Sequence, residues 1–98
     1  MYRVGDLVVS TTRHEVTRGD QVIELTAREF EILALLASQP GRVFTRDQII
    51  SAVWDYDFSG ETRIVDVHVS NLRDKIEVDP SEPELIQTVR GVGYKLVG

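Results

Sequence analysis

The residues best suited to chemistry lie in the last third of the chain, between Glu61 and Tyr94. Residues 61–76 read Glu-Thr-Arg-Ile-Val-Asp-Val-His-Val-Ser-Asn-Leu-Arg-Asp-Lys-Ile, a pattern with many hydrogen-bonding side chains. After an acidic, proline-broken spacer comes Thr88-Val-Arg-Gly-Val-Gly-Tyr94, a glycine-punctuated hairpin with an arginine near its tip. A polar helix followed by such a hairpin suits a helix in a DNA major groove with a β-wing beside it.

Residues 64–76 must be helical for this chemistry to work, and their periodicity has two interpretations. Val65, Val67 and Val69 alternate with polar residues, which on its own predicts a strand. Over the wider window, Val65, Val69, Leu72 and Ile76 fall at i, i+4, i+7 and i+11, which is one stripe of a helix. A strand would put Leu72 and Ile76 on the face opposite the valines. We therefore predict a helix.

A helix of this phase turns a mixed polar face away from the core. Asn71 has an amide suited to an adenine edge, Ser70 a hydroxyl that bonds several bases, and Val67 a methyl surface for thymine. The simpler alternative is a solvated helix face, and it stays open, although Val67 gains nothing from water there. The helical wheel puts Arg63, Val67, Ser70, Asn71 and Asp74 outward and His68, Arg73 and Lys75 on the flanks.

Catalytic and metal chemistry find little support in the sequence. The chain has no cysteine, and its two histidines, His14 and His68, lack a partner at metal-binding spacing. The paired carboxylates are all i, i+2 in helix or loop contexts and need not converge; they are Glu29/Glu31, Asp55/Asp57 and Glu82/Glu84. We expect no enzyme activity, no metal and no cofactor.

The net charge of −5 argues against DNA binding, because most DNA-binding proteins have a basic surface that attracts phosphate. The distribution of the charge along the chain makes this argument weaker. Residues 1–61 carry 6 basic and 10 acidic groups (−4), whereas residues 62–98 carry 5 basic and 6 acidic groups (−1). Four of those six acids lie in the spacer 77–84, and the segment from Leu85 onward has Arg90 and Lys95 without an acid.

The remaining elements form a single domain of 98 residues, and the expected class is α+β. Short β-branched runs separated by turn residues predict a four-stranded antiparallel meander at Tyr2–Val4, Leu7–Ser10, His14–Thr17 and Gln21–Leu25. Capping boxes at residues 26–29 and 45–48 predict the starts of two helices, the first ended by Pro40-Gly41 and apolar almost all round. The second carries the stripe Ile49, Ile50, Val53 and Trp54; residues 43–44 are expected as a brief strand and residues 55–60 as a loop.

Several segments together resemble the C-terminal effector domain of OmpR/PhoB-family response regulators. They are Gly-Arg-Val-Phe-Thr-Arg-Asp-Gln (41–48), Val-Trp (53–54), Arg-Ile-Val-Asp-Val-His-Val-Ser-Asn-Leu-Arg (63–73) and Thr-Val-Arg-Gly-Val-Gly-Tyr (88–94), at the family's spacings. The resemblance runs from about Tyr2 to the end. It implies a winged helix-turn-helix with an N-terminal four-stranded sheet, three helices and a C-terminal β-hairpin wing.

The resemblance also implies roles for particular residues. Those expected to touch DNA phosphates are Trp54, Thr62, Arg63, His68, Lys75 and Thr88. Those expected to face bases are Val67, Ser70, Asn71 and Arg73, and Arg90 is expected to reach a minor groove from the wing. The loop Asp55, Tyr56, Asp57, Phe58, Ser59, Gly60 and Glu61 corresponds to the family's contact site for RNA polymerase.

The implied function of residues 1–98 is sequence-specific binding of double-stranded DNA by the effector domain of a two-component response regulator. Implied partners are tandem DNA half-sites, RNA polymerase and a sensor histidine kinase acting through a receiver domain that we expect to precede this one. The alternative is a winged-helix module that contacts only proteins, which the acidic balance favours. We expect no membrane contact, since apolar runs are short and no signal peptide opens the chain. The resemblance implies a bacterial cytoplasmic location, and we expect the isolated domain to be monomeric.

Overall fold

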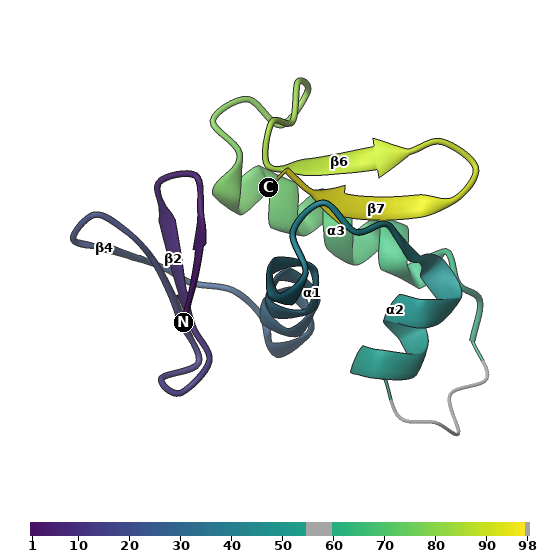
Figure 1. The fold of residues 1–98 in the computed structure, drawn as a ribbon, viewed down its shortest axis with the longest axis horizontal. Coiled ribbons are helices and arrows are strands. Elements are labelled where there is room, and N and C mark those ends of the chain that lie inside the picture. The colour runs from purple at the N-terminus through teal and green to yellow at the C-terminus, as the bar shows by residue number, and fades with distance from the viewer. Residues whose placement is uncertain (55–59, 98) are drawn as a thin grey trace.

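The computed structural model describes residues 1–54 and 60–97, and three helices and seven strands lie in that part of the chain. The strands are β1 (Tyr2–Val4), β2 (Leu7–Ser10), β3 (Glu15–Arg18), β4 (Gln21–Ile23), β5 (Phe44–Thr45), β6 (Ile86–Val89) and β7 (Gly93–Leu96). The helices are α1 (Ala27–Ser38), α2 (Arg46–Val53) and α3 (Ile64–Ile76). Helix α1 lies between the four-stranded sheet and the remaining elements, and the β6–β7 hairpin lies along α3 (Figure 1). The α+β architecture expected from the sequence is confirmed.

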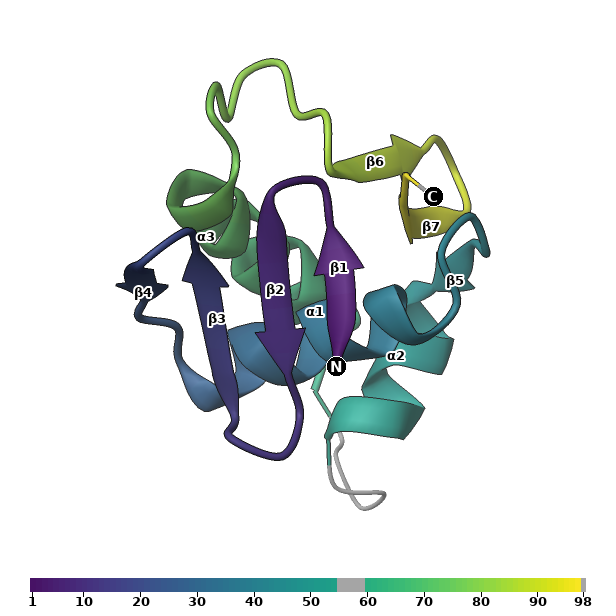
Figure 2. The ribbon, with the colours of Figure 1, turned by 60° about the vertical axis from the view of Figure 1, so that its left-hand side comes forward.

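The N-terminal sheet is an antiparallel meander in the order β1-β2-β3-β4, and α1 covers one of its faces (Figure 2). Two-residue turns join Val4 to Leu7 and Arg18 to Gln21. Their first residues, Gly5 and Gly19, have positive φ angles of 58° and 60°. Such angles favour glycine and match the twist of a tight hairpin.

Three predicted bounds of these strands were wrong, and one of them is the end of the third strand, which lies at Arg18 instead of Thr17. The third strand begins at Glu15 instead of His14, because Ser10 pairs with Glu15 and leaves a four-residue turn. His14 closes that turn with φ 54°, and its ring packs 4.0 Å from that of Phe30. The fourth strand ends at Ile23, two residues earlier than expected.

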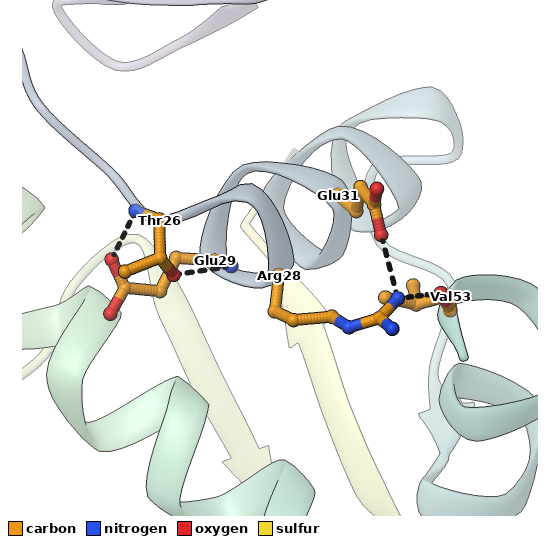
Figure 3. Close-up of polar contacts among 5 residues, drawn as sticks. All are labelled: Thr26, Arg28, Glu29, Glu31 and Val53. Carbon is orange, nitrogen blue, oxygen red and sulfur yellow. Dashed lines mark hydrogen bonds and ion pairs between the residues drawn. The ribbon is translucent and has the colours of Figure 1, made fainter. Parts of the chain in front are cut away.

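Both capping boxes are confirmed. In the first, the Glu29 amide donates to the Thr26 hydroxyl (3.2 Å) and the Thr26 amide donates to the Glu29 carboxylate (3.0 Å; Figure 3). In the second, Thr45 and Gln48 exchange the same two bonds at 3.1 and 3.0 Å. Each pair satisfies amides that a helix start leaves without partners.

Helix α1 is buried on more than one side, as its composition predicted; its buried apolar residues are Phe30, Ile32, Leu33, Leu36 and Ala37. Helix α2 buries only Ile49 completely. Ile50, Val53 and Trp54 of its predicted stripe are half-buried against the core.

The brief strand before α2 lies one residue later than expected, at Phe44–Thr45, and pairs with β7. A Cβ on Gly93 would lie 1.9 Å from the Phe44 carbonyl oxygen, so only glycine permits this approach. The pairing attaches the start of α2 to the C-terminal hairpin.

Helix α3 resolves the contested segment in favour of a helix. Val65, Val69, Leu72 and Ile76 are each 0% exposed, whereas Val67 is 58% exposed. One face of α3 therefore completes the core while the opposite face remains on the surface.

Glu77 begins the acidic spacer between α3 and β6 and hydrogen-bonds to the end of that spacer; its side chain is buried, and the residue is 7% exposed. Its carboxylate accepts hydrogen bonds from the backbone amides of Glu84, Leu85 and Ile86 at 2.9–3.1 Å. Three backbone donors thereby satisfy the buried charge, as burial of a charge demands.

No helix among the described residues is long and apolar enough to cross a bilayer.

Candidate nucleic-acid interface

The outward face of α3 is polar, with one apolar side chain at its centre. Ser70, Asn71 and Asp74 are exposed around Val67, as the helical wheel predicted. Arg63 is exposed in the turn immediately before the helix and makes no side-chain cap. Short donors and acceptors, a branched apolar group and a cation at one end thus share one surface, which suits base edges, a thymine methyl and a phosphate.

The β6–β7 hairpin extends beside this face. Arg90 is exposed at its turn, followed by Gly91 with φ 75° and by Val92, which is 45% exposed. The Val92 amide closes the turn on the Val89 carbonyl at 2.9 Å. A cation at the tip of a narrow hairpin is suited to reach a minor groove.

Arg73 joins α3 to this hairpin. Its Nη2 donates to the Ile86 carbonyl and to the Thr88 hydroxyl, both at 2.8 Å. Its guanidinium carbon lies 5.5 Å from the Tyr94 ring centroid. Of the four residues expected to face bases, the structure places Val67, Ser70 and Asn71 outward and turns Arg73 against the wing.

Asp66 connects α3 to two further elements. Its Oδ1 accepts from Arg46 Nε of α2 at 2.8 Å and from the Tyr94 hydroxyl of β7. Burial alone raises the pKa of Asp66, but the hydrogen bonds from Tyr94 and Arg46 outweigh it and lower the pKa from 3.8. The pKa of Tyr94 is raised by burial and by its bond to Asp66.

Sequence reasoning missed this cluster of Arg46, Asp66 and Tyr94. The available signal was the placement of Asp66 beside the core stripe of α3, where an acid needs a partner. The sequence does not say which cation or hydroxyl folds back to it.

Lys75, which was expected at the phosphate contacts, is paired with a buried acid of α1. Its Nζ lies 2.6 Å from Oε1 of Glu29, whose side chain is 3% exposed. Burial on its own raises the pKa of Glu29, but the bonds from Lys75 and from the Thr26 amide lower it from 4.5.

The remaining predicted phosphate contacts lie on three elements. Trp54, half-buried at the end of α2, packs edge-on against His68 of α3, with ring centroids 5.3 Å apart. Thr62 is half-buried in the turn before α3, and Thr88 is exposed on β6. Residues 55–59 of the expected polymerase loop lie outside the described residues; Gly60 and Glu61, which end it, are exposed.

A metal centre finds no basis in residues 1–54 and 60–97, where no three His, Cys, Asp or Glu side chains gather closely enough to hold an ion.

Comparison with known proteins gives a consistent result. Residues 20–96 match the family model described as "Transcriptional regulatory protein, C terminal". The alkaline phosphatase synthesis transcriptional regulatory protein PhoP of Bacillus subtilis is 53% identical over 93 residues, which cover 95% of this chain and 39% of PhoP. The chain thus spans about two fifths of the length of that relative.

Two solved structures are similar in fold. The response regulator DrrB, an OmpR/PhoB homologue from Thermotoga maritima, has a TM-score of 0.90 and 37% identity, over 99% of this chain and 44% of DrrB. The DNA-binding domain of Klebsiella pneumoniae RstA, solved in complex with the RstA box, has a TM-score of 0.86 and 30% identity, over 97% of this chain and 94% of that domain.

Proposed function

Since this chain belongs to the family of C-terminal, DNA-binding domains of OmpR/PhoB-type transcriptional regulators, we propose that it binds double-stranded DNA sequence-specifically, with α3 in the major groove and the β6–β7 wing at the adjoining minor groove. The matching family is described as one of transcriptional regulators.

The observation that carries the proposal is the surface of α3. Val67, Ser70 and Asn71 face outward from α3, whose opposite face is completely buried. The outward face is therefore accessible to DNA and is held rigidly by the core. The wing is hydrogen-bonded to the same helix through Arg73, and therefore Arg90 has a fixed relation to the base-reading face. Rigid presentation of this sort favours recognition of one helical groove.

Individual roles follow from position and chemistry. Asn71 and Ser70 read base edges, Val67 contacts a thymine methyl, and Arg90 enters a narrow minor groove. The proposed phosphate contacts are Trp54, Thr62, Arg63, His68 and Thr88. Arg73 and Lys75 instead act within the protein, Arg73 on the wing and Lys75 on α1.

This division of the cations lowers the expected salt dependence. Of the five basic groups in residues 62–98, Arg73 and Lys75 are paired internally, which leaves Arg63, Arg90 and Lys95. Each neutralised phosphate contributes about 0.9 to the slope of log K against log salt, so one domain should give a slope of about −3.

A fluorescence anisotropy titration would test the proposal. The domain is titrated into a random duplex and into a duplex selected from a random pool, at several salt concentrations. We expect tighter binding to the selected duplex and weakening with salt on both. Absence of binding to any duplex at low salt would contradict the proposal and favour the protein-contact alternative, which the net charge of −5 supports.

Functions of a longer protein are further proposals, since the chain covers 39% of PhoP. We propose that a receiver domain phosphorylated by a sensor histidine kinase pairs two copies of this domain on tandem half-sites. The loop 55–61 contacts RNA polymerase in this scheme, and the protein acts in the bacterial cytoplasm.

A further inference from the structure

The C-terminal end of α2 lacks a cation of its own. Helix α2 ends at Val53, and no basic residue lies in its last turn. The last carbonyls of a helix have no partners within it and carry partial negative charge, so they favour a positive donor. That donor comes from another helix: Arg28 Nη1 of α1 donates to the Val53 carbonyl oxygen (Figure 3).

The same guanidinium lies over the next residue. The Arg28 Cζ atom is 5.1 Å from the ring centroid of Trp54, within the range of a cation–π contact. Glu31, one turn further along α1, ion-pairs with Arg28 Nη1 at 3.3 Å and holds the side chain in this orientation. One planar group thus fixes both the backbone of residue 53 and the ring of residue 54, which a lysine ammonium does less well.

Trp54 in turn contacts the helix that carries the base-reading face. Its ring meets the His68 ring edge-on, with centroids 5.3 Å apart and an angle of 61° between planes. Arg28, Trp54 and His68 therefore form a continuous stack from α1 through the end of α2 to α3. Trp54 and His68 are two of the phosphate contacts in the proposed function.

We propose that Arg28 is a positioning residue for DNA binding, which orients Trp54, and through it His68, toward the phosphate backbone. The inference rests on the proposed function. Arg28 acts through Trp54 and not as a phosphate contact itself, because Nη1 is engaged by the Val53 carbonyl and Glu31, and its guanidinium carbon lies over the indole.

The first arm of the test needs no DNA. Trp54 is the single tryptophan of the chain, so its fluorescence reports only on this stack. Arg28→Gln should increase quenching of Trp54 emission by acrylamide, and Arg28→Lys should give an intermediate value. Arg13→Gln is the matched control, since it removes one charge from an arginine whose side chain is 75% exposed in the turn between β2 and β3. Quenching equal to wild type in Arg28→Gln would overturn the proposal.

The second arm measures DNA affinity in two backgrounds. Arg28→Gln should weaken binding to the selected duplex by about two- to fivefold, the scale of one exposed cation–π contact, while Arg13→Gln has less effect. Trp54→Phe keeps an aromatic ring but removes the indole N–H. In the Trp54→Phe background, Arg28→Gln should cause a smaller further loss, because the indole N–H that it positions is already absent and only the ring contact with His68 remains.

The two arms separate the possible failures. A wild-type domain that binds no duplex contradicts the proposed function, whereas wild-type binding with no loss in Arg28→Gln contradicts only the positioning role. Equal losses in both backgrounds, with a salt slope reduced by about one, would mean that Arg28 contacts phosphate directly and overturn the role through Trp54. A urea melt of each variant establishes that it folds, and Arg28→Lys supplies the comparison if Arg28→Gln does not.

Discussion

The Lys75 ammonium and the Glu29 carboxylate lie 2.6 Å apart and join the last turn of α3 to the first turn of α1. The same Glu29 oxygen accepts the Thr26 amide of the capping box at 3.0 Å. One carboxylate therefore both starts α1 and anchors the end of the helix that carries the base-reading face. Because the Glu29 side chain is 3% exposed, losing Lys75 would leave a buried charge without its cation.

Acid should destabilise the domain partly through Glu29 and Asp66. Both pKa values are lowered in the folded state, from 4.5 and 3.8 respectively. The stability that these carboxylates contribute is therefore present above the unfolded-state pKa and is lost as pH falls through the lower folded-state pKa. Glu29→Gln should be less stable at neutral pH and should show a flatter decline between about pH 5 and 3. Urea melts across this pH range measure the unfolding free energy of wild type, Glu29→Gln and the control Glu24→Gln, whose side chain is exposed. Parallel declines in all three proteins would refute the contribution of Glu29 to the acid sensitivity.

Burial on α3 predicts unequal effects of two identical substitutions. Val69→Ala removes two methyls from a side chain that is 0% exposed and should cost about 1–3 kcal/mol of unfolding free energy. Val67→Ala, at 58% exposed, should cost little. Urea melts compare them directly, and equal losses would be inconsistent with the observed helix phase.

Specificity and affinity should separate at Asn71 and Arg63. Asn71→Ala should flatten the preference at one base position by about 1–3 kcal/mol. Arg63→Ala should weaken all sequences about equally and reduce the salt slope by about one. Titrations on single-base variants of the selected duplex measure both; a change in base preference confined to Arg63→Ala would require a different docking of α3.

Arg73 should control the wing instead of reading a base. Arg73→Met removes the two hydrogen bonds to Ile86 and Thr88 while keeping an unbranched side chain. Faster amide exchange in β6 and a weaker preference for A·T-rich minor grooves should follow, as Arg90 loses its fixed position. Thr88→Val removes only the hydroxyl acceptor and should have a smaller effect. Loss of specificity at a major-groove base with unchanged exchange would assign Arg73 to direct readout.

A single domain should bind one half-site weakly. With three available cations and a net charge of −5, we expect a Kd on the order of micromolar at physiological salt. Two half-sites about one helical turn apart should bind two domains more tightly, since neighbouring sites raise the effective concentration. Titrations on duplexes with half-sites spaced by about 10 to 11 and 15 to 16 base pairs test this dependence on spacing. Nanomolar affinity for a lone half-site, or equal affinity at both spacings, would exclude binding as a pair on adjacent half-sites.

Local patterns were sufficient to predict most of the fold. Both capping boxes begin helices at the predicted residues, because the Thr26–Glu29 and Thr45–Gln48 bonds involve only neighbouring residues. Residues 64–76 form a helix in spite of the alternating valines, because the helix buries four apolar residues along its whole length on one face. The errors at His14 and at the brief fifth strand are shifts of one residue, which depend on pairing between strands.

The outward face of the candidate site was predictable for the same reason, whereas the bonding partners of its flanks were not. Val67 and Asn71 point outward from helix geometry alone. The engagement of Lys75 by Glu29, 46 residues away, and of Arg73 by Thr88, 15 residues away, arises only when α1 and the wing pack against α3. Long flexible cations on a helix flank have several partners within reach, and their choice depends on tertiary packing.

The hydrogen bonds of Glu77 fix the start of the wing next to the end of α3, independently of the spacer that connects them. Because its carboxylate clamps the amides of residues 84–86 immediately after α3 ends, the distance between helix and wing does not depend on the length of residues 78–83. An insertion at exposed Ser81 would lengthen only a surface excursion, in the kind of position where proteins accept extra residues. The spacer is thus a site where a peptide tag or a small reporter module can be grafted without altering the geometry that meets DNA.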